Sequence, residues 1–161
     1  MYAYQIANWT VFLSVAAGVA ATLTGLIFVA VSINLRRILE FPPLADRAAE
    51  SILQMFGALI ASLCALLPGQ SLLVLGTELA VLGATLWTLQ TLLIYRSYSP
   101  EYPRPVFSIV LALLATLPFV VGGISLAVGA LGGLYWLAPG VLLSVTVGVS
   151  NAWVLLVEIL R

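Results

Sequence analysis

The chain has 161 residues and a formal net charge of zero, and 63% of its residues are hydrophobic while only 7% are charged. A soluble domain carries roughly 25% charged residues, so this chain has too few polar side chains to cover a soluble core. The zero net charge and the lack of a basic patch also argue against a nucleic-acid partner.

Long apolar segments follow one another along the chain, and five are long enough to cross a bilayer as helices. They cover residues 9–35, 45–67, 71–95, 106–131 and 135–160. Connectors rich in Pro or Gly separate most of them, and Asp46 in the first connector is placed to cap the second helix. We therefore predict an all-α, polytopic membrane protein: a bundle of five transmembrane helices in one integral membrane domain over residues 1–161. The N-terminus has no pattern of a removable signal peptide.

The arginines predict how the bundle is oriented. They flank the first connector, flank the third connector and end the chain: Arg36, Arg37, Arg47, Arg96, Arg104 and Arg161. With five crossings these positions share one side of the membrane, which the positive-inside rule assigns to the cytoplasm. The N-terminus is then outside and the C-terminus is cytoplasmic. The mixed charges around the first connector, which include Glu40 and Glu50, are expected to form a solvated surface.

Two of the predicted helices carry a stripe of small residues, which lets helix backbones approach closely. The first helix has Ser14, Gly18, Ala21, Gly25 and Ser32, and the fourth has Ala115, Pro118, Gly122, Gly129 and Gly133. Packing inside a bundle is the simplest explanation for each stripe alone, but two stripes in one chain favour self-association. Pro118 should kink the fourth helix, and with Gly122 and Gly123 it marks the predicted hinge.

Glu78 lies inside the third predicted helix, about 11 Å from its outer end. All arginines are predicted on the other side, so no cationic side chain of the same chain can reach it. Three interpretations stay open: a protonated acid bonded to neighbours such as Asn8, Gln70 or Tyr135, a carboxylate in a water-filled vestibule, or a carboxylate that holds a cation from outside. Ionisable residues inside membranes are functional candidates by default.

The fifth predicted helix contributes the other polar candidates. Asn151 lies in the inner third of the membrane, and Asn34 at the inner end of the first helix is its candidate partner. Asn151 either holds helices together or lines a polar constriction further along a path that begins at Glu78. Glu158 lies near the cytoplasmic surface, where it can pair with Arg161.

Sequence patterns of catalysis and cofactor binding are absent. The chain has no P-loop, GxGxxG, HExxH or CxxC pattern, and it has no histidine. Glu78 and Glu158 lie near opposite surfaces and cannot form a catalytic pair within one subunit. The lone Cys64 is expected to be a packing residue. We therefore predict that the protein is not an enzyme and has no resident cofactor or metal.

Several stretches together resemble a known family. They are GLIFVAVSINL (25–35), LPGQS (67–71), LGTEL (75–79), GLYW (133–136) and NAWVLLVEILR (151–161). The chain is similar in these stretches to a family of small uncharacterised bacterial membrane proteins with about five predicted helices, over nearly its whole length. The resemblance implies a multi-pass protein of the bacterial cytoplasmic (inner) membrane. It implies no reaction and no ligand.

Two functions are expected from these features. The first is a homo-oligomeric channel or channel-like permeation protein for cations, because the outer face carries an acid and no basic side chain. Glu78 would be the outer cation site and Asn151 a lining residue, with the lipid bilayer, further copies of the chain and an inorganic cation as partners. The alternative is a non-transporting scaffold or regulatory subunit of a larger membrane complex, which would act through the small-residue faces and the arginine-bearing connectors.

Overall fold

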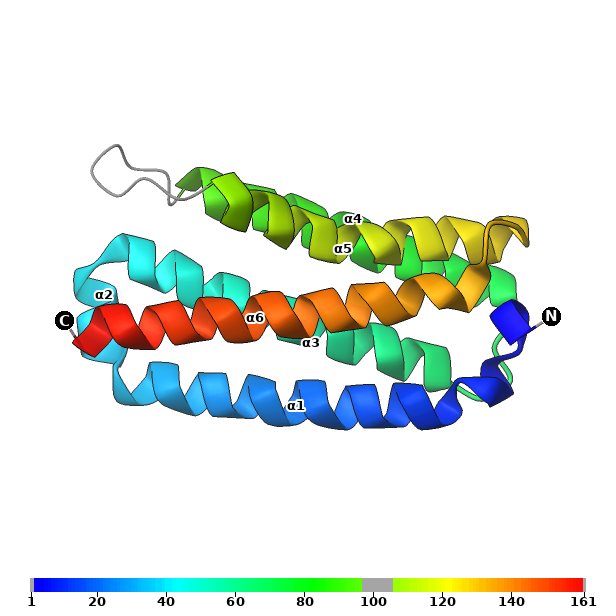
Figure 1. Ribbon diagram of the computed structural model, residues 1–161, viewed down its shortest axis with the longest axis horizontal. Helices are drawn as coiled ribbons and strands as arrows, with labels where there is room; N and C mark the ends of the chain where they lie inside the picture. The colour runs from blue at the N-terminus through cyan, green and yellow to red at the C-terminus, as the bar shows by residue number, and fades with distance from the viewer. Residues whose placement is uncertain (1, 97–105, 161) are drawn as a thin grey trace.

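The computed structural model describes residues 2–96 and 106–160, and this part of the chain contains helices and no strand. Five long helices run side by side in alternating directions (Figure 1): α1 (Thr10–Ile33), α3 (Pro42–Leu66), α4 (Leu72–Arg96), α5 (Val106–Val128) and α6 (Leu137–Leu160). The shorter elements are η1 (Tyr2–Tyr4), η2 (Ile6–Asn8), α2 (Leu35–Glu40) and η3 (Gly133–Trp136). Five segments of the described residues are long and apolar enough to cross a membrane; four lie within α1, α3, α4 and α5, and the fifth runs from η3 into α6. The prediction of an all-α fold with five such helices is confirmed.

The two ends of the bundle differ in composition. The N-terminal end holds η1, η2, the turn between α3 and α4, and η3, whereas the C-terminal end holds α2 and the last turn of α6 (Figure 1). The described arginines belong to elements at the C-terminal end: α2, the first turns of α3 and the last residue of α4. The positive side chains of the described residues therefore gather at one end of the bundle.

The connection between α1 and α3 differs from the prediction. Asp46 was expected to cap a helix that begins near residue 45, but α3 begins at Pro42, and prolines occupy its first positions. Proline is favoured there because the N–H group that it lacks would have no partner in the first turn. Asp46 therefore lies inside α3, and the residues just before the connector form the separate helix α2. The proline-rich connector predicted after residue 96 lies outside the described residues.

Glycines bring the backbones of α4 and α5 into direct contact. A Cβ atom on Gly123 of α5 would collide with the backbone nitrogen of Ala80, and one on Gly76 of α4 would lie 2.6 Å from the carbonyl oxygen of Gly123. A Cβ atom on Gly83 would lie 2.7 Å from the backbone nitrogen of Val120. Real Cβ atoms do not approach other atoms this closely, so no side chain fits at these three positions. The helix that carries Glu78 is thus packed tightly along α5.

The predicted hinge residues lie in this packed region. α5 continues through Pro118, and Pro118, Gly122 and Gly123 are all buried. A Cβ atom on Gly122 would lie 2.9 Å from the Cβ atom of Trp136. Gly122 and Gly123 therefore make close packing contacts, while the hinge itself stays a prediction.

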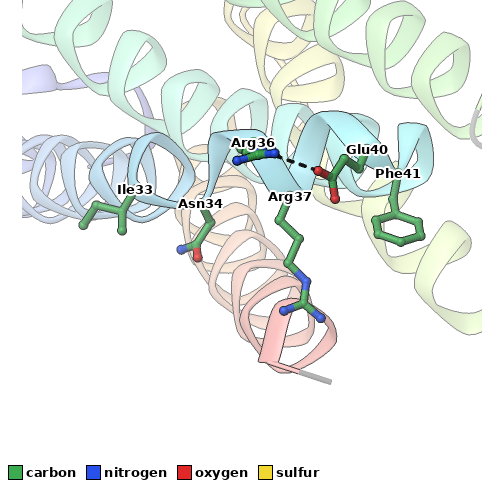
Figure 2. Close-up of a pocket in the computed structure, with 6 residues that line it drawn as sticks. All are labelled: Ile33, Asn34, Arg36, Arg37, Glu40 and Phe41. Carbon is green, nitrogen blue, oxygen red and sulfur yellow. Dashed lines mark ion pairs between the residues drawn. The ribbon is translucent and has the colours of Figure 1, made fainter.

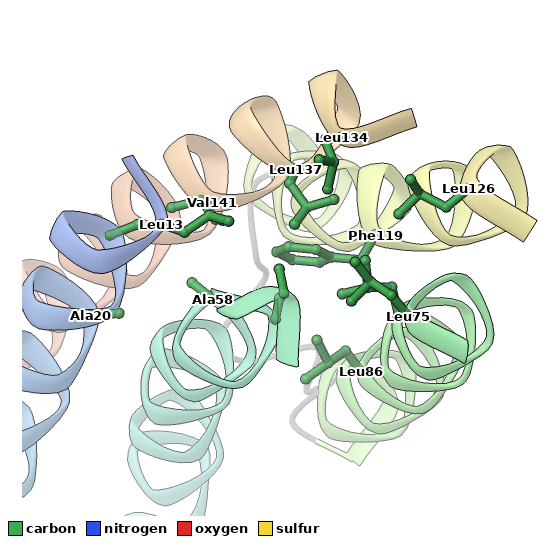
Figure 3. Packing of buried hydrophobic residues seen from close by; sticks show 14 residues of the cluster. Leu13, Ala20, Ala58, Leu75, Leu86, Phe119, Leu126, Leu134, Leu137 and Val141 are labelled. Carbon is green, nitrogen blue, oxygen red and sulfur yellow. The ribbon is translucent and has the colours of Figure 1, made fainter. Parts of the chain in front are cut away.

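The apolar core is built around Phe119 of α5, whose side chain is fully buried. Figure 3 shows its ring between Leu75 of α4 and Leu137 of α6. Gly140 of α6 leaves room for this ring, because a Cβ atom there would lie 2.9 Å from the ring of Phe119. α1 lies at the edge of the bundle and packs mainly against α3.

The two small-residue stripes have different surroundings. On α5, Ala115, Pro118 and Gly122 are buried inside the bundle. On α1 the stripe is exposed at every position: Ser14, Gly18, Ala21, Gly25 and Ser32. A Cβ atom on Gly18 or Gly25 would have no neighbouring atom within 4 Å. Packing inside the bundle therefore explains the α5 stripe, and it does not explain the α1 stripe.

The last two positions of the predicted α5 stripe fall outside the helix. α5 ends at Val128 rather than near residue 131, so Gly129 and Gly133 follow it. Both have a positive φ angle, 72° and 51°, which glycine adopts without the steric cost that other residues carry. These two glycines therefore shape the turn into η3 rather than a helix face.

Candidate functional site

Glu78 lies in an open groove between α3 and α4, six residues from the start of α4, which is about 9 Å along the helix axis. The groove has a volume of about 450 Å³ and is lined by Ile60, Cys64, Thr77, Glu78, Val81, Leu82 and Thr85. The side chain of Glu78 is half-buried. We call this feature the Glu78 groove. It opens to the surface of the monomer, so the acid does not face the centre of the bundle.

Glu78 has neutral hydrogen-bonding neighbours. The amide nitrogen of Gln70, in the turn before α4, donates to its Oε2 atom at 2.5 Å, and the thiol of Cys64 also lies within hydrogen-bonding reach. Gln70 was a predicted neighbour of Glu78, and this contact is confirmed. The other two predicted neighbours have different contacts: Asn8 donates to Gln5 at 3.0 Å, and the ring of Tyr135 packs edge-on to Trp9 at 4.9 Å.

The electrostatic prediction for Glu78 also agrees with the described residues. All described arginines lie at the C-terminal end of the bundle, and the ion pair seen there joins Arg36 to Glu40 at 3.7 Å. Glu78 lies near the opposite end. An ionised Glu78 would therefore carry a negative charge with no described arginine beside it.

The exposed side of α4 continues the polar character of the groove. Thr77, Thr85 and Thr88 are exposed, and helical periodicity places them on the same side of α4 as Glu78. Each hydroxyl donates to a carbonyl of its own helix, at 2.8 to 2.9 Å. A hydroxyl that donates in this way still has oxygen lone pairs for a further ligand. We call Thr77, Glu78, Thr85 and Thr88 the polar face of α4.

A second group of polar side chains, which was not predicted from the sequence, is buried toward the C-terminal end of the bundle. Glu50, Ser51 and Gln54 of α3 and Gln90 of α4 are each at most 2% exposed. The expectation that Glu50 belongs to a solvated surface is wrong, because Glu50 lies on the face of α3 that packs against the bundle interior. We call Glu50, Gln54 and Gln90 the buried amide site.

The two glutamines of this site each link two helices. The amide nitrogen of Gln54 donates to the carbonyl of Ala112 in α5 at 3.0 Å, and that of Gln90 donates to the backbone carbonyl of Glu50 at 3.4 Å. Neither amide oxygen has a hydrogen-bond partner in the part of the chain that the structure describes. A sequence signal for the site was present, because Glu50 and Gln54 are four residues apart and so share one helix face.

The predicted pair of Asn34 and Asn151 does not form among the described residues. The side-chain nitrogen of Asn34 donates instead to the carbonyl of Ala30 in its own helix at 2.9 Å, and Asn151 is half-buried in α6. Asn34 lines a surface pocket of about 490 Å³. The other residues that line it are Ile33, Arg36, Arg37, Glu40 and Phe41 (Figure 2).

The predicted ion pair at the end of α6 is not tested by the structure. The side chain of Glu158 and the whole of Arg161 lie outside the described residues. Their contact, and the place of Glu158 near the cytoplasmic surface, therefore stay predictions.

The fold and the groove together indicate a helical, multi-pass membrane protein. It is all-helical in its described part, has five helices that are long and apolar enough to cross a membrane, and carries an acid in an open groove. No family model, no curated protein and no solved structure matches the chain. The resemblance to small bacterial five-helix membrane proteins therefore stays a prediction.

Proposed function

We propose that the protein is a homo-oligomeric cation channel of the bacterial cytoplasmic membrane, in which the polar face of α4 lines a path between subunits. The observation that supports this function best is the place of Glu78, in an open groove with no described arginine beside it. The path would run from Glu78 along Thr85 and Thr88, whose hydroxyl oxygens can accept a cation. Asn151 stays a candidate lining residue nearer the cytoplasm.

Self-association follows from the cost of an exposed acid in lipid. In a monomer that spans a membrane, the Glu78 groove would open to the hydrocarbon, where ionisable side chains are rare and costly. A second subunit that covers the groove would replace lipid with protein and water. The exposed stripe on α1, where Gly18 and Gly25 have free space, offers a second surface for close helix packing.

The proposed orientation has the N-terminal end of the bundle outside the cell. The described arginines lie at the opposite end, which the positive-inside rule assigns to the cytoplasm. Glu78 would then meet cations that enter from outside. The negative charge at this mouth would raise the local concentration of cations and repel anions.

Purified protein reconstituted in liposomes tests the proposed conduction. A K⁺ or Na⁺ gradient is expected to give a flux well above that of protein-free liposomes. A chloride gradient set up with a large, impermeant cation is expected to give none. A potential-sensitive dye or an ion-selective electrode measures the flux. No flux under any gradient would overturn the channel and favour the alternative, a scaffold or regulatory subunit that uses the exposed α1 stripe to bind a partner.

Cys64 allows a second test, because it is the only cysteine of the chain and lines the Glu78 groove. A methanethiosulfonate reagent that attaches a quaternary ammonium group to Cys64 is expected to block the cation flux, because it places a positive charge beside Glu78. Dithiothreitol should restore the flux, and a Cys64→Ser variant should not respond to the reagent. Normal flux through protein that mass spectrometry shows to be fully modified would argue against a path through the groove.

A further inference from the structure

The two glutamines of the buried amide site lie at one level of the bundle, where each bonds to a backbone carbonyl of another helix. Gln90 donates to the carbonyl of Glu50, and in an α-helix this is the carbonyl that accepts the backbone N–H of Gln54. The amide of Gln90 therefore lies within one helical turn of Gln54 on α3. Both side chains belong to the same level of the bundle.

The contact between α4 and α5 places the third helix at this level. Gly83 lies against Val120 in the antiparallel pair, and continuing this register by two turns sets Gln90 opposite Leu113. Ala112, whose carbonyl accepts the hydrogen bond from Gln54, is the next residue. Residues of α3, α4 and α5 thus surround the two amides.

The hydrogen bonds of the two amides determine which of their atoms lack a hydrogen-bond partner. Each amide nitrogen donates to a backbone carbonyl, so turning either amide around would set its oxygen against another oxygen. The remaining oxygens have no partner among the described residues, and the side chains of Gln54 and Gln90 are 1% and 0% exposed. A buried oxygen without a partner is unfavourable, so a ligand that interacts with oxygens would stabilise the junction.

The chemistry of the junction favours a small hard cation as that ligand, because such cations prefer oxygen ligands. Glu50 is 2% exposed and has an interaction of its own, so we assign the ligand role to the amide oxygens of Gln54 and Gln90. These oxygens carry no formal charge, and neutral oxygens of this kind bind monovalent ions in channel filters. A divalent ion would need additional ligands that carry negative charge.

This site is separate from the Glu78 groove. Gln90 follows Glu78 by twelve residues on α4, or about 18 Å along the helix axis. Between them Leu86 packs onto Gly57 of α3, where a Cβ atom would lie 2.5 Å from its side chain. An apolar layer therefore divides the two polar regions.

We propose that the amide oxygens of Gln54 and Gln90 bind a monovalent cation such as Na⁺ inside the bundle. Melting curves of the purified protein in detergent test this, in NaCl and in choline chloride of equal ionic strength. Na⁺ is expected to raise the melting temperature in a saturable way, since a ligand that binds only the folded state stabilises it. Gln90→Met keeps the length of the side chain, removes the oxygen, and should weaken the Na⁺ affinity by about tenfold or more.

The matched control is Gln5→Met, which makes the same change at an exposed position at the N-terminal end of the bundle and should leave the response to Na⁺ unchanged. Identical melting curves of the wild-type protein in the two salts, the result expected if a water molecule bridges the two oxygens, would overturn the proposal. An unchanged response in Gln90→Met would overturn it too. A wild-type titration without any Na⁺ effect overturns the proposal even where Gln90→Met does not fold, and a saturable Na⁺ effect that persists in Glu78→Gln supports the glutamine site rather than the Glu78 groove. Because the titration measures binding at equilibrium, its result is independent of whether the protein conducts ions.

Discussion

Glu78→Gln is expected to reduce the cation flux of reconstituted protein by about tenfold or more, because charged clefts change the local concentration of ions by that order. The substitution removes the negative charge and nearly preserves the size of the side chain, and its amide can still bond to Gln70. A loss of flux would therefore report the charge. Flux under a K⁺ gradient, per reconstituted protein, is the measurement.

Glu40→Gln is the matched control for this prediction. It removes the same charge from an exposed side chain at the C-terminal end, where Glu40 pairs with Arg36, and it should leave the flux close to that of the wild type. Glu78→Asp, which keeps the charge, should retain most of the flux. Equal flux through Glu78→Gln and wild-type protein would show that Glu78 handles no ion.

Gly123→Ala is expected to destabilise the protein by about 3 kcal/mol, at the upper end of what overpacking usually costs. The added methyl group would collide with the backbone nitrogen of Ala80 and lie 2.6 Å from the carbonyl oxygen of Gly76. Backbone atoms cannot move aside as a flexible side chain can, so α4 and α5 would have to separate. The midpoint of unfolding, followed by helical circular dichroism of purified protein, measures the effect.

Gly25→Ala provides the comparison, since it adds the same methyl group on α1 where no atom lies within 4 Å. The monomer should lose no stability, because alanine also favours helix more than glycine does. If Gly25→Ala weakens self-association alone, the exposed α1 stripe is a subunit contact. Equal losses of stability in Gly123→Ala and Gly25→Ala would contradict the assigned packing of α4 on α5.

Glu78 could be identified from the sequence as a candidate site residue, and Gln70 as its neighbour, because both signals are local. A single acid stands out in a long apolar segment, and Gln70 lies in the turn directly before it. The open groove could not be predicted, because its other wall comes from Cys64 and Ile60 of α3. Which face of α4 meets α3 depends on how each helix is rotated about its axis.

The buried amide site was even harder to predict from the sequence than the Glu78 groove. Glu50 was predicted to be solvated because charges cluster around it in the sequence, yet it lies on the face of α3 that is buried in the bundle. Gln54 bonds to Ala112, a residue 58 positions away in the chain. No local pattern contains that contact.

The sequence by itself determined the number of apolar helices, their alternating directions and the gathering of the described arginines at one end, because length, hydropathy and connector composition act within each segment. The tertiary structure alone decided that the α1 stripe is exposed while Ala115, Pro118 and Gly122 of α5 are buried. It also decided that Glu78 opens to the surface, and that Gln54 and Gln90 each bond to a backbone carbonyl of another helix. These features depend on the rotation and register of neighbouring helices, which contacts such as that of Gly123 with Ala80 set between distant parts of the chain.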